Sequence, residues 1–420
     1  GGGRRGVPLG FALENITSLG DGRMGLDVLL RQRLEGNISG LTTWTGQVSL
    51  DGDIVIEPGV TLRLAAGTWV TFAAGDKRAA GFDTTRSEII VYGELVVDAT
   101  VGDPVTIGRQ GAAGRLWLGV LLPGAGSPGL EAAVRSGALI LEGATLGLTR
   151  ARLPPGRTTW SGTQQIPWDV IVPAAAELFI EAGATVRFAA EDLSLRGRSP
   201  GFTELVVEGG LVVRGSAAAP AVFTIDPQDR SELWSGVQLV EGGTVDAEGL
   251  TLTHAGVGFA GDVTDGFRLA DSRLSRLVTG LRLTLFDDAT VDRVDLRTIT
   301  TNAINASGFG TLRLRNSVVE GNGREGVVVN NAGLLVIDSR ISGNGLLDKE
   351  DPRSGLVADG GRGQRIEMWN TAVDGNRLHG IDLGSWEGIF ELHGSTVIGN
   401  RGDGLRADGA ERIVLEEAEV

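Results

Sequence analysis

Residues 316–329 read NSVVEGNGREGVVV, and the same pattern recurs along residues 266–420 at intervals of 22–24 residues, except where an insertion lengthens the coil that starts at Asp338. Each repeat has one turn position. Apolar residues stand four and two positions before it, and another stands three positions after it. The turn positions are Asp271, Arg293, Asn316, Asp338, Asn370, Gly394 and Glu417. About ten residues later, Gly or Ala precedes a second alternating apolar pair. Alternation over a few residues predicts short strands that bury one face.

Few folds combine this period with short one-sided strands. A propeller blade needs about 40–45 residues, and a leucine-rich repeat needs its own Leu and Asn consensus. A parallel β-helix fits, because each strand pairs with the equivalent strand of the next coil and like side chains stack in columns. Parallel connections are overwhelmingly right-handed, so we expect a right-handed coil.

The N-terminal part contains a tandem duplication. Residues 42–74 and 158–190 align without a gap at an offset of 116 residues, and the match extends over 42–150 and 158–255. Residues 1–41 fit the coil template as well. We therefore predict an all-β, single-stranded right-handed parallel β-helix of about 17–18 coils. It would be one continuous solenoid of first coils (1–41), repeat unit A (42–150), repeat unit B (158–255) and regular coils (266–420).

Two stretches resemble known proteins. NSVVEGNGREGVVV resembles the right-handed parallel β-helix repeat of bacterial and phage proteins. Residues 53–72, DIVIEPGVTLRLAAGTWVTF, resemble a segment common in exported and surface β-helix proteins of bacteria. The resemblance implies the fold. It does not decide the activity, since this fold carries lyases, hydrolases, adhesins and plain spacers.

Composition narrows the class of protein. A net charge of −15 argues against nucleic acid as a partner, because phosphate binding needs a basic face. The absence of cysteine excludes disulfides and thiolate chemistry. The sequence has no apolar run of about 18 residues, so we predict no transmembrane segment. With no starting Met, the chain is predicted to be part of a longer, extracellular or cell-surface bacterial protein.

Asparagines recur six residues after four of the turn positions. Stacked Asn side chains can hydrogen-bond to one another from coil to coil. We predict such a structural ladder, formed by Asn322, Asn344, Asn376 and Asn400.

Outward-facing side chains are the candidates for binding. Trp369 and His393 fall in one outward column, and Asp382 and Arg406 fall in another; we predict that these four, with Trp386, contact a glycan or a partner. No set of acids with a nearby base is evident, as a lyase or hydrolase of this fold would need. We expect no cofactor, with Asp348, Glu350 and Asp351 as the weak candidates for Ca²⁺.

These observations favour a non-catalytic exported β-helical protein: a rigid stalk, an adhesin or a component of a larger assembly. Its expected partners are other protein subunits or cell-surface glycans. A polysaccharide lyase or glycoside hydrolase with a groove along the outward face is one alternative, and a glycan-binding module is another. Several acids and a base converging on one face would favour the enzyme, whereas exposed aromatic side chains would favour glycan binding.

Overall fold

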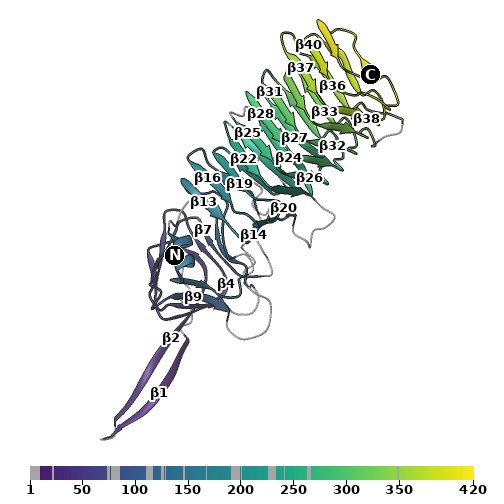
Figure 1. Ribbon diagram of the computed structural model, residues 1–420. Helices are drawn as coiled ribbons and strands as arrows, with labels where there is room; N and C mark the ends of the chain where they lie inside the picture. Colours follow the sequence, from purple (N-terminus) through teal and green to yellow (C-terminus); the bar gives the residue numbers. More distant parts are fainter. Residues whose placement is uncertain are drawn as a thin grey trace. The chain divides into compact units, whose positions relative to one another are not determined.

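The structure, a computed structural model, describes residues 10–20, 23–72, 76, 86–109, 117–123, 127, 129–144, 147–166, 168–190, 199, 201–225, 233–240, 242–262, 266–347 and 350–420. The chain divides into two compact units, Gly1–Arg152 and Leu153–Val420, and Figure 1 labels many of their strands. Among the described residues, no helix has the length and apolar character needed to cross a membrane.

Unit 2, residues 153–420, is built from three parallel sheets that we call I, II and III. Sheet I contains, in order, β13 (Gly156–Trp160), β16 (Ala176–Ile180), β19 (Gly210–Arg214), β22 (Thr244–Glu248), β25 (Phe267–Ala270), β28 (Asp288–Asp292), β31 (Thr311–Arg315), β34 (Gly333–Ile337), β37 (Arg365–Trp369), β40 (Ile389–His393) and β42 (Arg412–Glu416). Sheet II contains β14 (Thr163–Ile166), β17 (Thr185–Phe188), β20 (Ala221–Ile225), β23 (Leu250–Thr253), β26 (Arg273–Ser275), β29 (Asp295–Arg297), β32 (Val318–Glu320), β35 (Arg340–Ser342) and β38 (Ala372–Asp374). Sheet III contains β15 (Val170–Val172), β18 (Glu204–Val207), β21 (Trp234–Val240), β24 (Ala255–Asp262), β27 (Thr279–Thr284), β30 (Ile304–Ser307), β33 (Val327–Asn330), β36 (Leu356–Gly360), β39 (Ile381–Trp386) and β41 (Leu405–Arg406).

Each coil of unit 2 from β13 to β39 contributes one strand to each sheet, and the apolar columns fill the interior. In sheet III, Ile304 pairs with Val327, Val327 with Leu356, and Leu356 with Ile381. All four side chains are fully buried, and burying each aliphatic side chain stabilises the fold by about 1.5–3 kcal/mol. The prediction of a right-handed parallel β-helix is confirmed.

The predicted turn positions have left-handed backbone. The φ angles are 48° at Asp271, 54° at Arg293, 48° at Asn316, 49° at Asp338 and 47° at Asn370. A second left-handed column lies five residues after the first, in the coils from His254 to Gly399. It contains His254, Arg276, Thr298, Gly321, Gly343, Gly375 and Gly399. Two sharp bends per coil, at fixed positions, let the strands of adjacent coils stay in register.

The four predicted asparagines form a ladder, of which Asn322, Asn344 and Asn376 are fully buried and Asn400 is half-buried. The side-chain amide of Asn322 donates to Oδ1 of Asn344 at 2.9 Å, Asn344 donates to Asn376 at 3.0 Å, and Asn376 donates to Asn400 at 2.9 Å. Each amide also donates to a main-chain carbonyl, as Asn344 does to Val319. The ladder therefore satisfies polar groups that would otherwise be buried without partners.

A second ladder, not predicted from the sequence, follows the turn positions directly. Hydroxyls one residue after the turn accept main-chain N–H bonds from the preceding coil: Leu250 donates to Ser272, Val294 to Ser317, Ser317 to Ser339, and Thr371 to Ser395. These hydroxyls stand one residue after the turn in each of these coils, so this ladder could have been predicted from the sequence.

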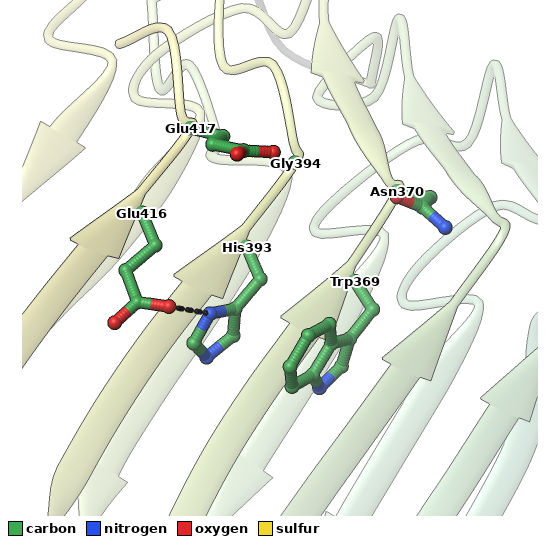
Figure 2. A pocket seen from close by; sticks show the side chains of 6 residues that line it. All are labelled: Trp369, Asn370, His393, Gly394, Glu416 and Glu417. Carbon is green, nitrogen blue, oxygen red and sulfur yellow. Dashed lines mark hydrogen bonds and ion pairs between the residues drawn. The ribbon is translucent and has the colours of Figure 1, made fainter.

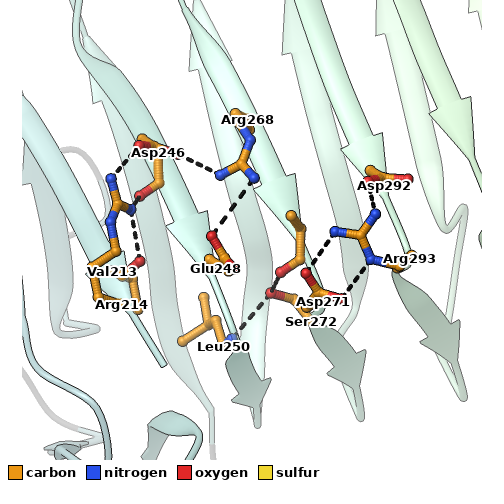
Figure 3. Close-up of polar contacts among 11 residues, drawn as sticks. Val213, Arg214, Asp246, Glu248, Leu250, Arg268, Asp271, Ser272, Asp292 and Arg293 are labelled. Carbon is orange, nitrogen blue, oxygen red and sulfur yellow. Dashed lines mark hydrogen bonds and ion pairs between the residues drawn. The ribbon is translucent and has the colours of Figure 1, made fainter. Parts of the chain in front are cut away.

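Ion pairs connect neighbouring coils on the outward surface (Figure 3). Arg268 bonds to Asp246 at 2.8 Å, and Arg214 bonds to the other oxygen of the same carboxylate. Arg293 contacts both oxygens of Asp271, at 2.6 and 2.7 Å. Partial burial raises the pKa of Asp246, but the hydrogen bonds from Arg268 and Arg214 outweigh it, so its pKa lies below the ordinary value.

Unit 1, residues 1–152, also consists mainly of parallel strands. One sheet contains β11 (Leu139–Leu141), β9 (Val105–Arg109), β6 (Trp69–Phe72), β4 (Gln47–Ile56), β7 (Glu88–Val91), β10 (Gly119–Leu122) and β12 (Gly147–Arg150), with β2 (Arg23–Ile38) beside β4 and β1 (Gly10–Gly20) beside β2. A smaller sheet contains β3 (Thr42–Trp44), β5 (Thr61–Ala65) and β8 (Glu94–Asp98), and the unit includes the helix α1 (Leu130–Ser136).

The first strands differ from the predicted coils over residues 1–41. β1 and β2 pair antiparallel, with Phe11 opposite Leu30 and Leu13 opposite Val28. The alternation of apolar residues indicates strands, and strands are present. Alternation does not distinguish a hairpin from a coil, because both bury one face of each strand. That units 1 and 2 continue one solenoid stays a prediction.

The two copies of the duplication form equivalent contacts. Phe72 stacks on Trp117 in the first copy, and Phe188 stacks on Trp234 in the second. A buried aspartate, Asp53 or Asp169, accepts the main-chain N–H of the glutamate 35 residues later, at 3.0 and 2.8 Å. The 116-residue offset therefore repeats internal packing as well as strand positions.

Candidate functional site

Trp369, His393 and Glu416 lie side by side on sheet I. Each is the last residue of its strand, in β37, β40 and β42, and the register pairs Trp369 with His393 and His393 with Glu416. Inward residues alternate with outward ones along a strand. Since Met368 and Leu392 are fully buried, the residues that follow them face outward. We call these three residues the Trp–His–Glu column.

The side chains of this column contact one another (Figure 2). The rings of Trp369 and His393 are stacked, with centroids 3.8 Å apart and planes 12° from parallel. His393 Nδ1 lies 3.0 Å from Glu416 Oε2, a bond that favours the tautomer with the proton on Nδ1 when the ring is neutral. Trp369 is 40% exposed, whereas His393 is only 9% exposed.

A second outward column, two residues before the first, adds two carboxylates. Glu391 Oε2 lies 3.8 Å from His393 Nε2, and Trp369 Nε1 donates to Glu367 Oε2 over a long 3.5 Å. Arg365 bonds to Glu367 at 3.3 Å and to Glu391 at 3.1 Å. His393 Nε2 has no hydrogen-bond partner in the part of the chain that the structure describes.

An open pocket of about 520 Å³ lies at the turn end of this column. Its walls are Trp369, His393, Glu416 and the three turn residues that follow them, Asn370, Gly394 and Glu417. Figure 2 shows the carboxylate of Glu416 on one side of the imidazole and the indole of Trp369 on the other, with the Glu417 side chain at the turn beside Gly394. The pocket thus combines one aromatic ring with two carboxylates.

The other predicted binding residues do not join this surface. Asp382 and Arg406 lie in sheet III, on β39 and β41, where Arg406 Nη1 approaches Asp382 Oδ2 at 3.7 Å. Asp382 also accepts the main-chain N–H of Gly384 at 3.1 Å. These two residues form a separate coil-to-coil contact.

The prediction for Trp386 is wrong. Its side chain is fully buried, because the chain leaves room for the indole at two glycines. A Cβ on Gly361 would lie 2.0 Å from Trp386 Cζ3, and one on Gly388 would lie 2.8 Å from Cζ2. The Trp386 side chain therefore packs in the apolar interior and is not accessible to a ligand.

The structure describes two of the three weak Ca²⁺ candidates, Glu350 and Asp351. Asp348 lies outside the described residues. Asp351 pairs with Arg353, which also reaches Glu325 at 3.3 Å. Over the ranges given above, no three His, Asp or Glu residues are grouped as metal ligands. Calcium binding through Asp348, Glu350 and Asp351 stays a prediction.

The sequence identified Trp369 and His393 but not the carboxylates around them. The sequence places Glu416 in the same outward column, because Glu416 stands one residue before the turn at Glu417, as His393 stands one residue before Gly394. Glu367 and Glu391 occupy the neighbouring column. Together these groups can accept hydrogen bonds from hydroxyl and ammonium groups, while the indole offers an apolar surface.

The fold and this surface define a right-handed parallel β-helix protein with an outward-facing Trp–His–Glu column. Residues 279–420 match the family model described as "Right handed beta helix region". Among solved structures, the chain is similar to the periplasmic alginate epimerase AlgG, with 10% identity and a TM-score of 0.34 over 89% of this chain and 76% of that one. It is also similar to the A-module of the Azotobacter vinelandii mannuronan C-5 epimerase AlgE6, with 12% identity and a TM-score of 0.31 over 89% and 90%. No curated protein matches the chain. Likeness at this level says nothing about the activity of this chain.

Proposed function

We propose that this protein is a non-catalytic, exported β-helical scaffold that acts as a rigid surface or assembly component. The observation that carries the proposal is the use of polar side chains in residues 266–420. Asparagine and serine ladders and many outward Arg–Asp pairs connect one coil to the next. Side chains committed in this way stiffen the stack.

An assay for turnover tests the non-catalytic role. Acidic, neutral and amino polysaccharides are incubated with the wild type and with His393→Ala, and unsaturated products and new reducing ends are measured. We expect neither product above the level without protein. Turnover by the wild type that is lost in the His393→Ala variant would show that the protein is a lyase or hydrolase, and would contradict the non-catalytic role. Protease treatment of intact source cells tests export, since a surface protein is digested and an internal one is not.

A second candidate function, glycan binding, rests on Trp369. Its indole is 40% exposed on a sheet face, and its N–H makes only a long bond to Glu367. Aromatic side chains with a free edge or face are suited to contact the C–H groups of a sugar, while neighbouring carboxylates accept its hydroxyls.

A glycan array with matched variants tests this candidate. Trp369→Ala is expected to abolish the signal that the wild type gives. Trp69→Ala is the control, because Trp69 in unit 1 is similarly exposed, at 46%, and lies outside the site. Binding that survives Trp369→Ala, or that both variants lose, would exclude the Trp–His–Glu column as the site.

A further inference from the structure

The bend between β27 and β28 exposes a large apolar side chain, and so does the same bend of the next coil. Leu285 is 53% exposed and Phe309 is 78% exposed, and both line one open pocket of about 300 Å³. β27 is paired with β24 on one side and with β30 on the other, so this surface lies among the coils of unit 2 and not at its end. Contiguous exposed apolar surface is typical of an interaction site. We call Leu285 and Phe309 the bend patch.

The backbone at Leu285 makes leucine an unusual residue there. The register places Gly308, Asn331 and Gly360 at the same position in the following coils. The φ angles are 51° at Leu285, 131° at Gly308, 56° at Asn331 and 68° at Gly360. Glycine and asparagine adopt such angles readily, whereas leucine does so at a cost. Leu285 gains no burial in exchange for that cost, and a strained position of this kind motivates a functional hypothesis.

Two exposed charges stand on either side of the bend patch along the coil. Arg282 lies three residues before Leu285, and Asp287 lies two residues after it. Within the part of the chain that the structure describes, neither side chain makes a hydrogen bond or an ion pair. The next acid, Asp288, does pair with an arginine, Arg313, at 2.8 Å. The patch is therefore flanked by one free cation and one free anion.

We propose that the bend patch binds a second copy of this chain. The two copies are related by a two-fold axis parallel to the axis around which the coils of unit 2 wind. Leu285 and Phe309 pack against the same residues of the second copy, and Arg282 of each copy faces Asp287 of the other. A two-fold interface must be complementary to itself, and this surface is. The proposal rests on the scaffold function and names a partner for its assembly.

Charge determines how the two copies face each other. A two-fold axis across the coils, in place of one along them, would set Arg282 against Arg282 and Asp287 against Asp287. Like charges that face each other across an interface are unfavourable, so the coils of the two copies run in the same direction. β27 offers no free strand edge, since both of its edges are paired, and the contact is made by side chains alone.

Sedimentation velocity of the full chain over a range of concentrations tests the association. We expect a reversible dimer. The Leu285→Asn/Phe309→Ser variant should weaken it at least about tenfold, because the apolar centre of the interface is lost. Asparagine tolerates the left-handed backbone, so this variant should melt like the wild type. Leu347→Asn is the matched control, because Leu347 is a leucine of similar exposure, 54%, elsewhere in unit 2. A monomer at every concentration, or a dimer that the patch variant keeps, would overturn the proposal.

Exchange of the two charges tests the arrangement. Arg282→Asp and Asp287→Arg should each weaken the dimer at least about tenfold, because like charges then face each other twice. The Arg282→Asp/Asp287→Arg variant should restore it, because the charges have only exchanged places and the net charge stays at −15. General repulsion between acidic chains predicts otherwise: Asp287→Arg would then tighten the dimer. That result, or a double variant that stays monomeric, would overturn the arrangement.

Self-association and the scaffold function can fail separately. A monomeric wild type would remove the dimer, and the turnover and protease assays would still decide the scaffold function. Turnover that depends on His393 would contradict the scaffold function, whereas the sedimentation of the patch and charge variants does not involve that residue.

Discussion

At the scale of single residues, backbone bends determine which side chains each coil tolerates. The second left-handed column has glycine in four coils, but Thr298 holds the same position with a φ of 54°. A β-branched residue in this region is an outlier. The left-handed conformation costs a non-glycine residue roughly 1–2 kcal/mol. Thr298 therefore reduces the stability of its coil, while its glycine equivalents do not.

Exchanging residues within this column tests the cost directly. Thr298→Gly is expected to raise the free energy of unfolding by about 1 kcal/mol, less the entropy that glycine loses on folding. Gly321→Ala is the matched opposite change and should lower it by about 1 kcal/mol. Gly321 has a φ of 66°, and no atom lies within 4 Å of an added Cβ, so backbone strain is the only penalty. Urea unfolding measures both changes, and equal stability of all three proteins would contradict the argument.

His254 is a second residue whose surroundings change its chemistry. Burial lowers the pKa of its imidazole, and the nearby Arg276 lowers it further. The folded state thus takes up the proton at lower pH than the unfolded state, whose pKa is about 6.5. Stability from this group is complete above the unfolded pKa and falls as pH drops toward the folded one.

A proton NMR titration measures this shift, because the chain has only three histidines. The His254→Asn variant assigns the resonance, and Asn tolerates the left-handed backbone at this position. We expect the His254 signal to titrate below about 6.5. In the Arg276→Gln variant it should move back toward that value. A midpoint at or above the ordinary pKa would disprove the lowered value.

At the scale of elements, the asparagine ladder ties sheet II to the turn that follows it. Asn344 is fully buried and is bonded on both sides, to Asn322 and to Asn376. Removing its amide leaves a donor on Asn322, the N–H of Asn322 and the carbonyl of Val319 without that partner. Each buried group left unsatisfied costs about 1–3 kcal/mol.

Asn344→Ala is therefore expected to lower the free energy of unfolding by about 3 kcal/mol or more. Asn400→Ala is the control, because Asn400 is only half-buried at the end of the ladder, where water can replace a lost bond. Thermal or urea unfolding should rank Asn344→Ala well below Asn400→Ala. Similar losses at the two positions would mean that the ladder does not act as a chain of bonds.

The elements also show what a sequence of this kind can predict. Inward columns and the asparagine ladder follow from strict repetition, since each coil samples the same environment. The burial of Trp386 was missed because it depends on Gly361, which lies one coil away in space. The antiparallel pairing of β1 and β2 was missed because strand alternation carries no direction. The pairing of His393 with Glu416 could be predicted from the strand register alone. Predicting Glu367 and Glu391 as neighbours required reading the adjacent outward column, two residues earlier in each strand.

At the scale of the whole molecule, the stability of each coil depends on the coils next to it. In a solenoid each repeat contacts mainly its neighbours. Val327 is fully buried between Ile304 and Leu356, whereas the adjacent Val328 faces outward on the same strand. The two valines therefore separate an effect of the interior from an effect of the strand itself.

Val327→Asp is expected to lower the free energy of unfolding by about 3–5 kcal/mol, because an unpaired charge enters the apolar interior. In hydrogen exchange, amides of β30, β33 and β36 should lose the most protection, and the loss should decline with each coil away from them. Strands of unit 1, such as β4, should keep theirs, since the division of contacts places them in a separate unit. Val328→Asp, on the outward face, should change protection little. A uniform loss across both units would show that the chain unfolds as one cooperative body, and an unchanged melt for Val327→Asp would refute the inward assignment on which the β-helix depends.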